Sequence, residues 1–115
     1  MKSPITTHVL DTALGRPAAG VPVRLERRKG GGGWEPLARG VTDADGRVAD
    51  LLPGAPRPAS GVYRLSFDTG AYFARRGAEA FYPYVEIVFA LEKPEEHHHV
   101  PLLLSPFGYS TYRGS

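Results

Sequence analysis

Four histidines are the side chains of this sequence best suited to proton transfer: His8 near the start, and His97, His98 and His99 in a row near the end. Histidine has an ordinary pKa close to neutrality, so it can act as a base, as an acid or as a metal ligand. If the triplet lies on a strand, His97 and His99 share one face and His98 points to the other. At most two of the three can then converge on one site.

Taken alone, the triplet has three interpretations: a solvated entrance to a strand after Glu95 and Glu96, a catalytic histidine, or part of a metal site. A zinc site needs three or four ligands, and the other candidates are His8 and carboxylates whose approach the sequence does not reveal. The chain has no cysteine, which excludes disulfides, thiolate metal sites and a cysteine nucleophile. If Val9 faces the core, His8 lies on the outer side of its sheet.

A short turn precedes Arg47. The residues Thr42-Asp43-Ala44-Asp45-Gly46 end in an Asp-Gly pair that is typical of a hairpin turn. Calcium loops share the Asp-x-Asp-Gly spacing, but the further ligands and the bidentate Glu of an EF-hand are missing here. We therefore expect a turn that ends at Arg47, not a calcium site.

The last four residues, Tyr112-Arg113-Gly114-Ser115, bring a hydroxyl, a guanidinium and a carboxylate together. Chain ends usually fray unless something holds them. The apolar run from Val100 to Leu104 and the aromatic residues Phe107, Tyr109 and Tyr112 precede this end. We expect them to hold the tail against a core, and the tail to form part of a site.

The elements that must position these residues are mostly strands. Alternation of apolar and polar residues predicts about eight short strands, which is typical of an all-β, two-sheet sandwich. One short helix is expected from about Thr69 to Arg76, with Asp68 as its N-cap and Gly77 as its stop. Residues 15–20 are predicted to form a turn, residues 30–33 a hairpin tip, and residues 53–60 a longer loop. The strands are expected at Ile5 to Leu10, Val21 to Leu25, Trp34 to Thr42, Arg47 to Asp50, Val62 to Phe67, Val85 to Leu91, His98 to Leu104 and Tyr109 to Tyr112.

Length and charge limit the class of protein. The chain has the length of one domain, residues 1–115. Its net charge is only +2 and its arginines are scattered among acids and prolines, so nucleic-acid binding is not expected. No stretch approaches the roughly 18 apolar residues of a transmembrane helix, and residues 1–7 lack the apolar core of a signal peptide. The final Arg-Gly-Ser is not the peroxisomal Ser-Lys-Leu address, so we expect a cytoplasmic protein.

Four segments together resemble one family. They are His8-Val9-Leu10-Asp11, Thr42-Asp43-x-Asp45-Gly46-Arg47, His97-x-His99-Val100-Pro101-Leu102 and the terminal Tyr112-Arg113-Gly114-Ser115. The sequence resembles the 5-hydroxyisourate hydrolases, the transthyretin-related enzymes of purine breakdown. Two turn segments, Gly15-x-Pro17-x-x-Gly20-Val21-x-Val23 and Thr42-Asp43-x-Asp45-Gly46, also resemble prealbumin-like modules of adhesins and carboxypeptidases, and so indicate the fold. The terminal Tyr-Arg-Gly-Ser is the family's signature, which the hormone-binding transthyretins lack.

The resemblance implies a transthyretin-like sandwich that hydrolyses 5-hydroxyisourate to 2-oxo-4-hydroxy-4-carboxy-5-ureidoimidazoline, on the way from urate to allantoin, without a metal or other cofactor. It implies His8, Arg47, His99 and Ser115 as catalytic residues. Tyr112, Arg113 and Gly114 would bind the substrate together with His8, Arg47 and Ser115. His97 is the less certain member of its pair, because the family's catalytic histidine immediately precedes Val-Pro. His98 stands where the family often has tyrosine.

The residue types suit the opening of a cyclic amide by water. Arginine stays charged and presents a planar fork of donors, so Arg47 can hold an oxyanion but is not the base. Either His99 or His8 would activate the water while Ser115 orients it, and attack by Ser115 itself is the competing chemistry. The resemblance also implies a homotetramer, a dimer of dimers with sites at the subunit interface. The alternative is a non-enzymatic transthyretin-like ligand-binding or adhesive module, and a metal-dependent hydrolase built on His97 and His99 is a further one.

Overall fold

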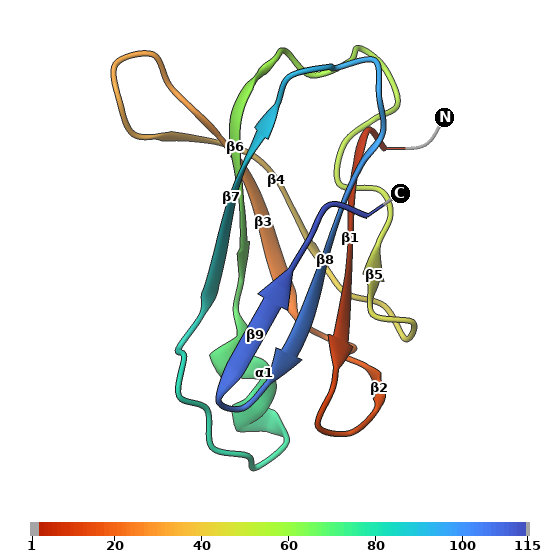
Figure 1. Ribbon diagram of the computed structural model, residues 1–115, viewed down its shortest axis with the longest axis vertical. Coiled ribbons are helices and arrows are strands. Elements are labelled where there is room, and N and C mark those ends of the chain that lie inside the picture. Colours follow the sequence, from red (N-terminus) through yellow and green to blue (C-terminus); the bar gives the residue numbers. More distant parts are fainter. Residues whose placement is uncertain (1–2, 115) are drawn as a thin grey trace.

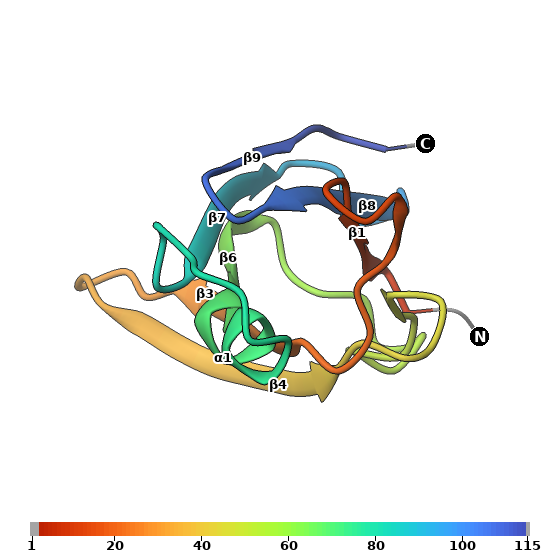
Figure 2. The ribbon, with the colours of Figure 1, turned by 90° about the horizontal axis from the view of Figure 1, so that it is seen from below.

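Two β-sheets face each other in the computed structural model, which describes residues 3–114 (Figures 1 and 2). One sheet has the strand order β2-β1-β8-β9, with β5 also paired to β1, and the other has the order β4-β3-β6-β7. The all-β, two-sheet sandwich predicted from the sequence is confirmed. The elements are β1 (Ile5–Asp11), β2 (Arg16–Pro17), β3 (Pro22–Arg28), β4 (Trp34–Val41), β5 (Arg47–Val48), β6 (Gly61–Phe67), α1 (Thr69–Arg75), β7 (Val85–Leu91), β8 (His98–Ser105) and β9 (Gly108–Thr111).

The core lies between the sheets and follows from the alternation of side chains along each strand. In β1, Ile5, Thr7, Val9 and Asp11 are buried, while the residues between them are only half-buried. Because successive side chains of a strand point to opposite faces, each strand gives one row to the core and the other to solvent. The largest fully buried side chains include Val9, Leu25, Tyr63, Leu65, Phe67 and Leu102.

The strand β1 joins segments that are far apart in the sequence. It runs parallel to β8, with Ile5 opposite His98 and Asp11 opposite Leu104. On its other edge it pairs antiparallel with β5 and β2. Figure 1 shows β5, β1 and β8 side by side, with the C-terminal segment returning along β8. This arrangement brings the first strand β1, the last strand β9 and the segment around Arg47 onto one sheet.

The helix α1 agrees with its predicted limits to within one residue. Asp68 is the N-cap, and its side chain accepts a hydrogen bond from the Ala71 N–H. The Tyr72 hydroxyl and the Arg76 guanidinium both donate to Oδ2 of Asp11, each at 2.7 Å. Asp11 is fully buried, so this charge is stabilised by two donors that tie the helix to the end of β1.

Three expectations about local structure were wrong. Residues 15–20 do not form a turn alone, because Arg16 and Pro17 pair with the end of β1 as the short strand β2. The turn before Arg47 exists but is not a hairpin, since β4 before it and β5 after it belong to different sheets. The aromatic residues near the end are not packed into the core: Phe107, Tyr109 and Tyr112 are exposed. Backbone pairing with β8 holds that segment instead.

Candidate active site

A threonine hydroxyl joins two of the histidines. Oγ1 of Thr6 lies 2.9 Å from Nε2 of His97 and 2.8 Å from Nδ1 of His99. The two imidazole rings are nearly parallel, with centroids 6.4 Å apart. Thr6 and His99 are opposite each other in the parallel pairing of β1 and β8, so strand register alone places the hydroxyl beside the ring. The prediction that His97 and His99 share a face is confirmed.

His98 points the other way. Its side chain is buried, and its Nδ1 lies 3.0 Å from the carbonyl oxygen of Glu96. His97, in contrast, is exposed and His99 is half-buried. The triplet is therefore neither a wholly solvated strand entrance nor a cluster of three rings, because alternation along β8 divides it between the core side and the outer face.

Arg47 reaches this face through a tight turn. Oδ1 of Asp43 accepts hydrogen bonds from the N–H groups of Asp45 and Arg47. Gly46 has φ +76°, and a Cβ there would lie 2.4 Å from the carbonyl oxygen of Val9, so only glycine fits this position. The turn brings Arg47 opposite His8 in the pairing of β5 with β1. Arg47 and His8 thus lie on the same outer face as Thr6 and His99.

The surroundings of His99 favour its neutral form. Its pKa is lowered from the ordinary value of 6.5, first by burial, then by the positive charge of Arg47 and by coulombic interactions with His8 and His97, while a hydrogen bond with the Thr6 backbone opposes the shift. Burial penalises the charged imidazolium and nearby cations repel it. At neutral pH the ring is therefore mainly unprotonated and able to accept a proton.

An open cavity of about 370 Å³ lies over these side chains. Both histidines of the Thr6 bridge line it, together with Arg47 from β5. Its full lining is Thr6, Thr7, Arg47, Val48, Ala49, His97 and His99. A neutral base, a cation and an open cavity together suit proton transfer next to a developing negative charge.

The C-terminal segment passes beside His99. The Gly114 N–H donates to the carbonyl oxygen of His99 at 2.8 Å, and the two residues form an antiparallel bridge. A Cβ on Gly114 would lie 2.6 Å from Cδ2 of His99. Since no side chain fits without moving the ring, glycine lets the tail lie directly against His99.

Tyr112 and Arg113, which the terminal signature also predicts in the site, lie away from His99. Arg113 is exposed and pairs with Glu96, with Nη2 2.9 Å from Oε1; this hydrogen bond is the main reason that the pKa of Glu96 is lowered. Tyr112 and Arg113 line a separate cavity of about 240 Å³ between β7 and β8, which His98 also lines. Ser115 lies outside the described residues. Within one chain, the structure gathers His8, Arg47, His97, His99 and Gly114 and sets Tyr112 and Arg113 apart.

Thr6 is the residue that sequence reasoning missed. A threonine two residues before His8 carries no sign of function in a strand that is rich in threonine. The alternation that puts His8 on the outer face puts Thr6 there too. This shared face was the one feature of the sequence that could have pointed to Thr6. Its partners could not be inferred, because they depend on the pairing of β1 with β8.

Among residues 3–114 no three side chains of histidine, aspartate or glutamate are grouped so as to hold a metal ion. The same residues include no helix with the length and apolar character needed to cross a bilayer.

Known proteins of similar sequence cover the whole chain. A mouse protein named 5-hydroxyisourate hydrolase is 52% identical, over 98% of this chain and 96% of its own length. A 5-hydroxyisourate hydrolase of Halalkalibacterium halodurans is 50% identical over the full length of both chains.

Solved structures give the same fold. The 5-hydroxyisourate hydrolase of Klebsiella pneumoniae matches with a TM-score of 0.82 and 44% identity, covering 96% of this chain and 98% of its own. Sea bream transthyretin, solved in complex with thyroxine, matches with a TM-score of 0.90 and 38% identity, covering 97% of this chain and 95% of its own. The sequence pattern of the family described as "HIUase/Transthyretin family" matches residues 5–114. On sequence and fold together, the chain belongs to the HIUase/Transthyretin family.

Proposed function

We propose that residues 1–115 form one catalytic domain that hydrolyses 5-hydroxyisourate to 2-oxo-4-hydroxy-4-carboxy-5-ureidoimidazoline during urate degradation. Relatives named for this activity match the chain over its full length, but a fold shared with a thyroxine-binding protein does not decide function. The observation that carries the proposal is the site itself. His99 has a lowered pKa, is bridged by Thr6 to His97, and shares a cavity with Arg47.

His99 is the general base in this proposal, and Thr6 sets its tautomer. If Nδ1 of His99 donates to Oγ1 of Thr6, the threonine hydroxyl donates in turn to Nε2 of His97. Nε2 of His99 then keeps a free lone pair for a proton from water. In the reverse arrangement, Nε2 of His97 donates to Thr6 and the Thr6 hydroxyl donates to Nδ1 of His99. Nε2 of His99 then carries a proton, which suits His99 to act as an acid later in the same cycle. Thr6 is therefore a positioning residue.

The reaction balances with the groups of this site. Nε2 of His99 takes one proton from water, and the hydroxide oxygen bonds to the carbonyl carbon of the cyclic amide. Arg47 stabilises the negative charge that develops on the carbonyl oxygen. The C–N bond then breaks, the imidazolium returns its proton to the departing nitrogen, and a carboxylic acid forms that releases its proton to solvent as a carboxylate. His8, opposite Arg47, lies where it can contact the substrate, and His8 remains the alternative base.

The terminal residues complete this proposal. Gly114 lies against the His99 ring. We propose that Ser115 orients the attacking water, since a serine without an adjacent oriented base is a weak nucleophile. A trapped acyl-enzyme in mass spectrometry would instead favour direct attack by Ser115. Tyr112 and Arg113 would reach a substrate only through a neighbouring subunit.

We also propose a homotetramer, a dimer of dimers. The strands β7 and β9 are edges of their sheets and lie on the same side of the sandwich (Figures 1 and 2), and open edges favour pairing with another chain. The cavity over His99 is open on the outer face of its sheet, and a second sheet facing it would close the site. Sedimentation on dilution, with activity measured in parallel, tests this: activity should fall as the assembly dissociates, and full activity in a proven monomer would contradict it.

The direct test of function is the decay of freshly generated 5-hydroxyisourate, followed by ultraviolet absorbance. Purified protein should accelerate the decay well beyond the spontaneous rate, and dialysis against a chelator should leave the acceleration unchanged. No acceleration by folded protein would overturn the proposal. Loss of the rate on chelation would favour the metal-dependent alternative.

The likeness to a thyroxine-binding transthyretin favours one alternative, a ligand carrier with no catalysis. A carrier has no use for a base beside the tail, so it should tolerate extra residues after Ser115. A hydrolase should lose rate with such an extension, because the tail lies against His99. A cytoplasmic location, as expected from the sequence, forms part of the hydrolase proposal, and fractionation of the native host tests it.

A further inference from the structure

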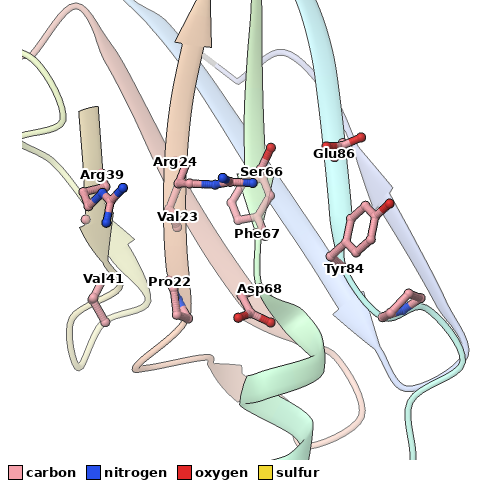
Figure 3. A pocket seen from close by; sticks show the side chains of 12 residues that line it. Pro22, Val23, Arg24, Arg39, Val41, Ser66, Phe67, Asp68, Tyr84 and Glu86 are labelled. Atoms are coloured by element: carbon pink, nitrogen blue, oxygen red, sulfur yellow. The ribbon is translucent and has the colours of Figure 1, made fainter. Parts of the chain in front are cut away.

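A second cavity, of about 600 Å³, lies on the outer face of the β4-β3-β6-β7 sheet. A row of four residues crosses this face at one level of the strands. Arg39 on β4 is opposite Arg24 on β3, Arg24 is opposite Ser66 on β6, and Ser66 is opposite Glu86 on β7. All four line the cavity. Figure 3 shows Arg24 reaching from β3 toward Ser66, with Arg39 on its other side.

The two arginines of this row have no anionic partner in the described part of the chain. Both are exposed, and among residues 3–114 neither forms an ion pair or a side-chain hydrogen bond. Like charges placed directly opposite each other on neighbouring strands destabilise a sheet. The neighbouring Arg64, in contrast, pairs with Glu26 at 2.8 Å and with Glu86 at 3.6 Å. An anion between Arg24 and Arg39 would remove their repulsion.

Ser66 provides an independent observation. Its side chain is only 6% exposed, and its Oγ has no hydrogen-bond partner within the described residues. A buried hydroxyl without a partner costs free energy that an alanine at the same place would avoid. Its position in the row, directly opposite Arg24, makes it a donor for the same anion.

The carboxylates that line the cavity restrict where an anion can bind. Glu86 is at the far end of the row from Arg39 and faces Arg64. Asp68 is engaged as the N-cap of α1, where it accepts from the Ala71 N–H. Their negative charges disfavour an anion at that side, so the favourable position lies between the two arginines and Ser66.

We propose that this cavity binds a small oxyanion, the carboxylate or phosphate group of a small molecule, between Arg24 and Arg39, with the Ser66 hydroxyl as a third donor. Guanidinium groups present paired donors that match both kinds of oxyanion. The site is on the opposite outer face from Thr6 and His99, and its existence does not depend on the hydrolase proposal.

The test uses the full-length protein labelled with ¹⁵N and titrated separately with inorganic phosphate and with acetate, at constant ionic strength maintained with sodium chloride. The amide resonances of Arg24, Arg39, Gly40 and Ser66 should shift and saturate with at least one of the two anions. Saturation by phosphate alone would identify a phosphate-bearing ligand, and saturation by acetate alone a carboxylate. Absence of a saturable shift with both anions would overturn the proposal.

Substitutions distinguish a specific binding site from non-specific attraction of anions to positive charge. Arg24→Gln or Arg39→Gln should weaken binding about tenfold, as expected for the loss of a charge-assisted hydrogen bond. Ser66→Ala should weaken it several-fold. Arg28→Gln is the matched control, since Arg28 is an exposed arginine of the same strand β3 outside the cavity. If Arg28→Gln weakens binding as much as Arg24→Gln, the attraction is non-specific and the proposal fails.

Discussion

The outer face of the β2-β1-β8-β9 sheet carries Thr6, His8 and His99, with Arg47 beside them on β5, whereas the outer face of the β4-β3-β6-β7 sheet carries Arg39, Arg24, Ser66 and Glu86. Both rows arise from the same alternation of side chains along strands. On the first face, the hydroxyl of Thr6 has two imidazole partners. On the second, the hydroxyl of Ser66 has none within residues 3–114.

The difference lies in what each row can do with a proton. The first row contains an imidazole, His99, whose pKa is lowered first by burial and then by the Arg47 charge, so its neutral form is favoured, which suits general base chemistry. The second row contains two arginines, a serine and a glutamate but no imidazole, so its residues suit binding and not proton exchange. Catalysis should therefore depend on the first face, and changes to the second should affect binding or stability.

The largest expected effect is from replacing His99. His99→Asn should lower kcat/KM about 100- to 10,000-fold, because that range is the usual contribution of a general base. The measurement is the initial rate of 5-hydroxyisourate decay, with circular dichroism to confirm that the fold is retained. His97→Asn is the matched comparison and should lose less, since His97 touches the base only through Thr6. Near wild-type turnover in folded His99→Asn would contradict the assignment.

Replacing Arg47 should have the next largest effect. Arg47→Gln should lower kcat about 100- to 1,000-fold, the usual loss for one donor to a developing oxyanion. It should also raise the pKa of His99 toward its ordinary value, because the Arg47 charge is one of the causes of the shift. A base acts in its neutral form, so the acidic limb of the pH–rate profile should move to higher pH.

Titration of the His99 ring by NMR, in the wild type and in Arg47→Gln, checks this second part separately from activity. The midpoint in the variant should lie at the higher pH. An unchanged midpoint would show that the Arg47 charge does not contribute to the shift and that Arg47 acts only on the substrate.

Gly114→Ala tests how closely the tail fits against the base. A Cβ on Gly114 would lie 2.6 Å from Cδ2 of His99, so the ring or the tail must move. A displacement of about 1 Å in a catalytic group can lower the rate by up to about 100-fold, and we expect a loss of roughly 10- to 100-fold in kcat. Gly108→Ala is the control, because a Cβ there meets only Oγ of Ser105 at 3.8 Å. Equal rates in the two variants would contradict a tight fit.

Thr6→Val should have a smaller effect, because it removes the bridging hydroxyl but keeps the shape of the side chain. We expect kcat to fall roughly 10-fold, as expected for about one hydrogen bond that orients the base. The KM should change little, since Thr6 acts through His99. A matched control is Thr12→Val, because the Thr12 hydroxyl donates to the carbonyl oxygen of Leu104, outside the cavity. A change in KM alone would mean that Thr6 contacts the substrate instead.

The smallest effect is expected on the second face. Ser66→Ala should raise the free energy of unfolding by about 1 kcal/mol, because it removes a buried hydroxyl without a partner. Urea denaturation in a buffer without phosphate or carboxylate measures this. A clear loss of stability would mean that Ser66 has a partner in the folded protein, and the contrast between Thr6 and Ser66 would disappear.

Much of the fold could be predicted from local patterns. The helix limits followed from Asp68 and Gly77, and alternation identified every strand longer than two residues. The short strand β2 was missed because Gly15, Pro17 and Gly20 indicate a turn, and only pairing with β1 makes Arg16–Pro17 a strand. The turn before Arg47 was mistaken for a hairpin, because an Asp-Gly pair does not reveal whether the next strand joins the same sheet.

The candidate site was predictable in part. A resemblance to a family gave His8, Arg47 and His99, and alternation gave the shared face of His97 and His99. Thr6 could not be found in this way, because a threonine becomes informative only when its neighbours are known. The proton-accepting state of His99 was also out of reach, since it depends on burial and on the charge of Arg47, which comes from a distant part of the chain.

The sequence by itself determined which side chains share a face, because the two-residue period of a strand is a property of the local backbone. Only the tertiary structure decided that β1 lies parallel to β8, with Thr6 opposite His99 across more than ninety residues of chain. Such a register is selected by burying the inner faces of both sheets together, and a slip of one residue would turn every side chain to the wrong side. The sequence therefore determines which residues can form the site, and the packing of the two sheets determines which of them come into contact.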